Sequence, residues 1–184
     1  VVKMNEGESD DKLRALLTQH LAKQLPEDGL WRLDEPKLWY ATIEQSKLYE
    51  QVDKASNYTG IADEETTLIV ENIEDLLQGL NNQLALIDLG SGDGRKSAII
   101  LKTAKERGHN VLYVPVDVSE HSLKLACQAA SPYASVSPVK ADFETLTLPQ
   151  IGREQNLVIM LGNTRQNFES LRVNNYISRN LRPQ

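Results

Sequence analysis

The most constraining feature of the sequence is an alternation of short apolar segments with amphipathic segments after residue 83. The apolar segments cover residues 84–89, 111–116, 136–140 and 157–161. Helix-favouring segments cover residues 95–107, 119–131 and 168–181. Short apolar runs suit strands buried on both faces, and strands joined by helices form parallel sheets with right-handed crossovers. The pattern therefore predicts an α/β, Rossmann-like fold with a partial parallel sheet.

The first part of the chain has a helical texture instead. Apolar residues at positions 13, 16, 17 and 21 repeat with helical spacing, and Pro26 breaks that pattern. We expect residues 31–60 to be irregular with short helical pieces. Asp63 is expected to cap a further helix that Gly79 ends. We therefore divide the chain into an N-terminal helical segment, 1–80, and a Rossmann-like domain, 81–184.

Composition excludes several classes of protein. The 184 residues carry a net charge of -6, so there is no surplus of cations for broad binding to nucleic acid. The single cysteine, Cys127, excludes an internal disulfide framework and a multi-cysteine zinc site, and we expect no metal. The apolar runs are too short to cross a bilayer, and we expect no signal segment. We therefore predict a cytoplasmic protein without a membrane partner.

A glycine-rich loop, Gly90-Ser91-Gly92-Asp93-Gly94, follows the first predicted strand. Such a loop lets the backbone approach a ligand at the carboxyl end of a sheet. A phosphate-binding P-loop would need lysine directly after its last glycine, where this chain has Arg95, and the dinucleotide fingerprint needs one more residue between glycines. The remaining candidate is S-adenosylmethionine (SAM), whose enzymes carry an acid-x-G-x-G-x-G loop. A tight turn without a ligand stays open as an alternative.

Acidic residues at two later strand ends favour the same ligand. Asp117 follows the second strand, where a carboxylate can accept both ribose hydroxyls. Asp142 and Phe143 follow the third strand, where they could meet the amino group and the ring face of adenine. Each has a structural alternative: Asp117 could cap a helix or sit in a solvated turn, and Phe143 could be a core residue beside a turn aspartate.

Taken together, these motifs resemble the histidine-specific SAM-dependent methyltransferase family. That family includes the histidine Nα-methyltransferase of ergothioneine biosynthesis and a fungal dimethylallyltryptophan N-methyltransferase. The resemblance covers roughly residues 30–184. Its clearest segments are 88–96, 113–119, 141–143, 161–168 and 181–183.

The resemblance implies roles for individual residues. The implied SAM-binding residues are Asp88, Gly90, Ser91, Gly92, Lys96, Asp117, Asp142, Phe143 and Gly162. Tyr40, Tyr58 and Asn167 would bind the substrate, and Tyr58 and Asn167 would orient its amine for catalysis. Alternatives stay open here too: Lys96 as an exposed helix residue, Asn167 as a helix cap, and the tyrosines as packing residues of the N-terminal helices.

The chain also departs from the family pattern. Asn57 and Ala62 replace an acid and an arginine around Tyr58, and we expect that the family's later strands and substrate domain do not follow the fourth strand. An edge strand with apolar flanks needs a cover, which could be an N-terminal helix, a homodimer partner or further chain. We expect a SAM-dependent N-methyltransferase acting on a small-molecule amino acid or derivative, histidine first. The alternative is a non-catalytic SAM-binding or interaction module without the substrate half.

Overall fold

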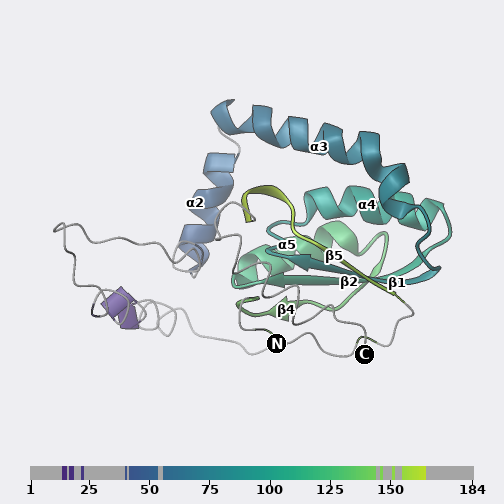
Figure 1. Cartoon of the computed structure of the whole chain (residues 1–184). Coiled ribbons are helices and arrows are strands. Elements are labelled where there is room, and N and C mark those ends of the chain that lie inside the picture. The colour runs from purple at the N-terminus through teal and green to yellow at the C-terminus, as the bar shows by residue number, and fades with distance from the viewer. Residues whose placement is uncertain are drawn as a thin grey trace.

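The protein forms one parallel sheet with helices packed on it (Figure 1). The computed structural model describes residues 40, 42–53, 56–143, 146, 151 and 155–164, with isolated positions between 14 and 22. The predicted helix over 168–181 and the substrate candidate Asn167 lie outside these residues. Tyr58 lies within a described helix, but its side chain is outside the description.

Within the described residues, the sheet contains five strands, and all of their pairings are parallel. They are β1 (Gln83–Leu89), β2 (Asn110–Asp117), β3 (Ser135–Val136), β4 (Val139–Lys140) and β5 (Gln155–Ile159). The order is β3-β2-β1-β5, and β4 also pairs with β2. The predicted α/β fold is therefore confirmed. Because β1 lies between β2 and β5, the strand order reverses beside β1, where ligands bind in such sheets.

Two strand predictions need correction in detail. The third predicted strand, 136–140, is two short strands separated by Ser137 and Pro138. Pro138 has no backbone N–H to donate, so the ladder stops there and resumes at Val139. The fourth strand begins and ends earlier than predicted, at Gln155 and Ile159.

The helices α4 (Arg95–Glu106) and α5 (Glu120–Ala130) lie close to their predicted ranges. Helix α3 (Ser56–Leu77) starts well before Asp63, so the prediction of a cap at Asp63 was wrong. No proline interrupts residues 56–77, and the helix therefore continues upstream of the aspartate. Helix α2 (Ile43–Asp53) occupies the segment expected to hold short helical pieces.

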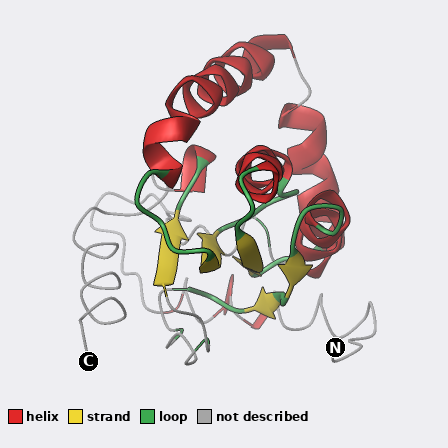
Figure 2. Cartoon of the chain, turned by 90° about the vertical axis from the view of Figure 1, so that its right-hand side faces the viewer, coloured by secondary structure: helices red, strands yellow, loops and turns green. Residues whose placement is uncertain are grey.

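Two apolar clusters lie on the sheet, one on each of its faces. On one face, strand residues pack under α3, α4 and α5, which lie together above the sheet in Figure 2. The buried members there include Leu77, Leu84, Leu86, Leu101, Tyr113 and Ala126. The opposite face carries Ile87, Leu89, Val114, Val116 and Phe143. Within the described part of the chain, none of the helices is both long enough and apolar enough to cross a membrane.

Candidate functional site

The glycine loop is fastened to the end of the neighbouring strand. The backbone N–H groups of Gly90 and Ser91 both donate to the carbonyl of Val116, at 2.8 and 3.2 Å. Gly90 has φ 70°, and a Cβ at this position would lie 2.6 Å from Thr164 Oγ1. A residue with a side chain would therefore be strained in its backbone and would collide with the segment after β5. The loop holds the ends of β1, β2 and β5 together.

Asp117 ends β2 with its carboxylate turned towards this loop. Its Oδ2 accepts the N–H of Gly92 at 3.0 Å, and its Oδ1 accepts the N–H of Ser119 at 2.8 Å. Burial raises the pKa of the Asp117 carboxyl above its ordinary value, and the N–H groups of Ser119 and Gly92 oppose that rise. The N-cap of α5 is Ser119, so the interpretation of Asp117 as the helix cap was wrong.

The third strand end lies directly beside the second. Lys140 pairs with Asp117 in the register of β4 and β2, and the N–H of Ala141 donates to the carbonyl of Asp117 at 3.0 Å. Asp142 therefore comes two residues after Lys140, the β4 residue that pairs with Asp117. Phe143 is only 6% exposed and packs in the core cluster on the lower face of the sheet. Its contact with an adenine ring stays a prediction.

Ser91, inside the glycine loop, presents an unusual oxygen. Its Oγ is buried. Of the buried side-chain nitrogen and oxygen atoms in the described residues, this one has no hydrogen-bond partner. Burial without a partner is unfavourable for a hydroxyl, which suits a position where a ligand atom completes the bond. The loop lies against three strand ends, and this hydroxyl lies within it. Both observations fit a polar cofactor such as SAM.

Asp88, by contrast, lies beneath the loop. It is 1% exposed, and its Oδ2 accepts hydrogen bonds from Ser97 Oγ and, at 2.7 Å, from the Tyr113 hydroxyl. Burial raises the pKa of Asp88 to about 6, and the hydrogen bonds from Ser97 and Tyr113 only partly offset that rise. This oxygen binds α4 and β2 instead of facing the crevice. The structure thus places Asp88 as a support of the site, and direct contact with SAM stays a prediction for it.

Lys96 and Gly162 meet at an acid that was not among the predicted site residues. Glu65 of α3 forms an ion pair with Lys96 Nζ through Oε2, and its Oε1 accepts the backbone N–H of Gly162 at 2.5 Å. Gly162 opens a short 3-10 turn, Gly162–Thr164, which begins three residues after the end of β5 at Ile159. One carboxylate therefore joins α3, the start of α4 and the end of β5.

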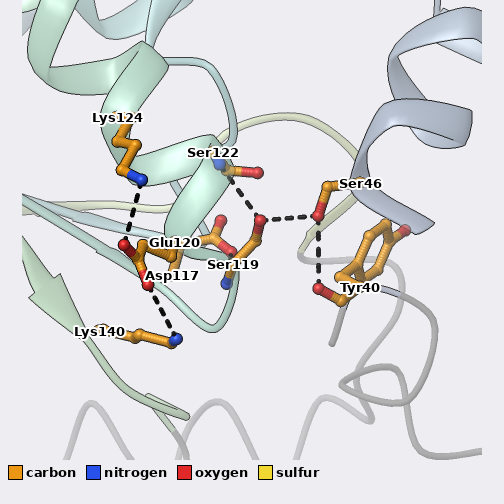
Figure 3. Close-up of polar contacts among 8 residues, drawn as sticks. All are labelled: Tyr40, Ser46, Asp117, Ser119, Glu120, Ser122, Lys124 and Lys140. Atoms are coloured by element: carbon orange, nitrogen blue, oxygen red, sulfur yellow. Dashed lines mark hydrogen bonds and ion pairs between the residues drawn. The ribbon is translucent and has the colours of Figure 1, made fainter. Parts of the chain in front are cut away.

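Helix α2 stands at the same end of the sheet (Figures 1 and 3). Ser46 Oγ and Ser119 Oγ are 2.7 Å apart, which ties α2 to the N-cap of α5. Tyr40 packs edge-to-face on Tyr49 with ring centroids 5.2 Å apart. Both rings line a pocket of about 40 Å³ with Ser46, Gly92, Asp93, Ser122 and Leu125, which is room for a water molecule. Tyr40 therefore lies beside the glycine loop, and its substrate contact stays a prediction.

The sequence interpretation missed Glu65, Thr164 and Ser46. Thr164 Oγ1 donates to the Gly90 carbonyl at 3.2 Å. All three act through contacts between segments far apart in the chain, and even where a resembling segment includes the residue, as 161–168 includes Thr164, that segment does not indicate the contact. The buried position of Asp88 could have been predicted from the sequence. Every second residue of a strand points to the same face, so Asp88 shares the helix-covered face with Leu84 and Leu86.

Three solved structures are similar to this chain. A SAM-dependent methyltransferase from Leishmania major has 16% identity and a TM-score of 0.53, over 91% of this chain and 62% of that protein. The phosphoethanolamine N-methyltransferase 1 of Haemonchus contortus has 14% identity and a TM-score of 0.44, over 97% and 30% of the two chains. The CMeT domain of the citrinin polyketide synthase has 21% identity and a TM-score of 0.49, over 95% and 45%.

The first of these structures supports the Rossmann-like fold, and this chain spans 62% of its length. No curated protein matches the chain. The family model of histidine-specific, SAM-dependent methyltransferases matches residues 13–182. SAM, the cofactor that the glycine loop and the strand ends predicted, is the cofactor of that family. Because the match extends over nearly the whole sequence, this chain belongs to the histidine-specific SAM-dependent methyltransferase family.

Proposed function

We propose that this chain binds SAM at the carboxyl ends of β1, β2 and β4. We further propose that it serves methyl transfer to a nitrogen of an amino acid or derivative, with histidine as the first candidate acceptor. The observation that carries the proposal is the hydrogen bond between Gly92 N–H and Asp117 Oδ2, at 3.0 Å. It brings the glycine loop and the ribose-binding candidate to one point, and Ala141 N–H at the Asp117 carbonyl adds the third strand end.

Each predicted group has a defined task in this proposal. The Asp117 carboxylate would accept hydroxyl donors of a ribose, in exchange for or beside the backbone N–H groups that it now accepts. Ser91 Oγ would gain the partner that it lacks within the described residues. Lys96 would hold a ligand carboxylate by its charge. The short loop contacts fix these groups before a ligand arrives, which reduces the ordering cost of binding.

Methyl transfer to an amine depends mainly on alignment. When bound, SAM supplies a methyl group on a positively charged sulfur. Tyr58 and Asn167 are proposed to orient the acceptor nitrogen, which must be unprotonated because its lone pair forms the new bond. The protein contributes by holding the acceptor in line with the methyl group, since correct placement of two reactants removes much of the entropic barrier. The proton that the nitrogen loses would pass to water or to a tyrosine.

Calorimetric titration of the chain with S-adenosylhomocysteine (SAH) tests the binding half of the proposal. We expect SAH to bind and NAD not to bind, because the loop has the glycine spacing of SAM enzymes. Binding of NAD but not SAH would overturn the assignment of the ligand. A folded chain, verified by circular dichroism, that binds neither would remove the proposed function altogether.

A radiolabelled methyl-transfer assay tests the second half. The chain is incubated with methyl-labelled SAM and, in separate reactions, histidine, a tryptophan derivative and a non-amine control. Label on histidine supports the proposed acceptor, and label on the tryptophan derivative alone would move the proposal to that class. SAH binding without transfer to either amine would favour the alternative, a SAM-binding module that transfers no methyl group.

A further inference from the structure

A pair of opposite charges lies at the point where the strand order reverses. Lys96 is in the first turn of α4, directly after the glycine loop, and Glu65 comes from α3. Their side chains form an ion pair and are 29% and 28% exposed, so a ligand can reach both. An ion pair that joins two distant segments could be purely structural, and its surroundings decide whether it is.

The surroundings place this pair inside the proposed SAM site. Glu65 Oε1 accepts the N–H of Gly162, so the carboxylate lies at the end of β5 as well as beside α4. A Cβ on Gly162 would lie 3.1 Å from Lys96 Nζ and 3.8 Å from Glu65 Oε2. Two residues further on, Thr164 binds the carbonyl of Gly90 in the glycine loop. The pair therefore lies between the loop after β1 and the loop after β5.

The charges of the pair match the amino-acid end of SAM. That end carries an ammonium group and a carboxylate on the same carbon atom. If Lys96 alone were engaged by the ligand carboxylate, Glu65 would face a like charge at short range, which is unfavourable. If Glu65 meets the ammonium group, both charges of the protein and both charges of the ligand are compensated.

We propose that Glu65 binds the α-ammonium group of SAM while Lys96 binds its α-carboxylate. The inference rests on the proposed function and adds a binding residue from α3 to it. On binding, the Lys96–Glu65 pair opens and each member takes the opposite charge of the ligand. Gly162 N–H keeps the Glu65 carboxylate aimed into the site. The sequence gives no hint of this role, because Glu65 lies in the N-terminal helical segment, outside the segments that the motifs cover.

The test compares ligands with and without the amino-acid end. Calorimetry measures the affinities of SAH and of methylthioadenosine, which keeps the nucleoside and the sulfur but lacks both charges. Glu65→Gln should weaken SAH binding about tenfold or more, as expected for the loss of a charge-assisted contact, and leave methylthioadenosine binding unchanged. Glu64→Gln is the matched control, because Glu64 is an exposed neighbour on the same helix, and it should change neither affinity.

The direction of the change in SAH affinity shows whether Glu65 binds the ligand or only blocks Lys96. If Glu65 only blocks Lys96, Glu65→Gln will bind SAH as tightly as the wild-type protein or more tightly, and the proposal fails. Wild-type protein that binds both ligands with no response to Glu65→Gln refutes this inference alone. Wild-type protein that binds neither ligand refutes the proposed function together with it.

A second measurement does not depend on the folding of any variant. The desamino analogue of SAH, which keeps the carboxylate and lacks the ammonium group, should bind the wild-type protein about tenfold more weakly than SAH. Equal affinities would overturn the proposal. Where Glu65→Gln folds, as judged by thermal unfolding, it should show little further loss with this analogue.

Discussion

The ends of β1 and β2 each carry an aspartate, and the two residues have different surroundings. Asp88 on β1 points to the face covered by α4 and is bound by the side chains of Ser97 and Tyr113. Asp117 ends β2, and its carboxylate is held by backbone N–H groups of two loops. The same residue type at two adjacent strand ends is therefore bound by side chains beneath the glycine loop in one case and by the backbone of that loop in the other.

Position along the strand explains the difference, because Asp117 shares the helix-covered face with Tyr113 but is the last residue of β2. Side chains alternate between the faces of a sheet, and Asp88 shares the helix-covered face with Leu84 and Leu86. Asp117 comes after Val116, whose carbonyl binds the glycine loop, so its side chain meets that loop directly. Its donors are part of the backbone and are fixed by the fold. An acid is thus a ligand candidate when it lies at the very end of a strand, past the part that the helices cover.

Asp117→Asn gives the largest expected effect and tests the second half of this comparison. The amide cannot accept at both of its ends, and it carries no charge, so SAH affinity should fall by about 3 kcal/mol, or about a hundredfold. Calorimetry with SAH measures the loss. Glu120→Gln is the control, because it removes a nearby charge whose ion-pair partners are the side chains of Lys124 and Lys140 (Figure 3). Equal effects of the two variants would contradict the assignment of Asp117.

Asp88→Asn tests the first half through the pH dependence of stability. The folded-state pKa of Asp88 is raised from 3.8 to about 6, so the folded protein binds its proton more readily than the unfolded chain does. The stabilisation from this proton is complete below the unfolded-state value and is lost as the pH rises through 6. The Asp88→Asn variant lacks this pH-dependent stabilisation. From pH 7.5 down to pH 4, the wild-type protein should gain about 2 kcal/mol relative to Asp88→Asn.

Urea unfolding at the two pH values measures this difference in the free energy of unfolding. Asp75→Asn, which removes an exposed carboxylate from α3, controls for the change in net charge. A difference between the wild-type protein and Asp88→Asn that does not vary with pH would show that Asp88 is not the buried, proton-binding group described above. SAH affinity at neutral pH should change less in Asp88→Asn than in Asp117→Asn.

Gly90→Ala gives the smallest expected effect and tests the contact between the loops after β1 and β5. A Cβ at Gly90 meets the side chain of Thr164, whereas Gly79, with φ 74°, has nothing within 4 Å of an added Cβ. Both substitutions strain a left-handed backbone, so their difference isolates the collision. Gly90→Ala should cost about 1–2 kcal/mol more in unfolding free energy than Gly79→Ala. Equal losses in thermal unfolding would mean that the two loops do not pack together as described.

Most of the sheet and its helices could be predicted from the sequence, because local patterns determine them. Buried strands are short and apolar, and Gly108 and Gly79 follow helix ends in left-handed backbone conformations. The errors have local causes as well. Pro138 divides the third strand, and the helix before β1 extends upstream of Asp63 because no residue stops it.

The candidate site could be predicted only in part. Motifs after each strand identified Gly92 and Asp117, which the structure brings within hydrogen-bond distance. The partners of Lys96 and Gly90 were not predictable, because Glu65 and Thr164 approach them through the packing of distant segments. Residues of one motif share a stretch of backbone, whereas contacts between segments depend on the completed fold.

The central claim is that the glycine loop, Asp117 and the Asp142 segment form one SAM site. The most direct test is an SAH titration followed by amide NMR. We expect the amide signals of residues 90–94, 117–119 and 141–143 to shift together with a single dissociation constant. Binding of SAH that shifts only one of these segments, or residues elsewhere, would contradict it.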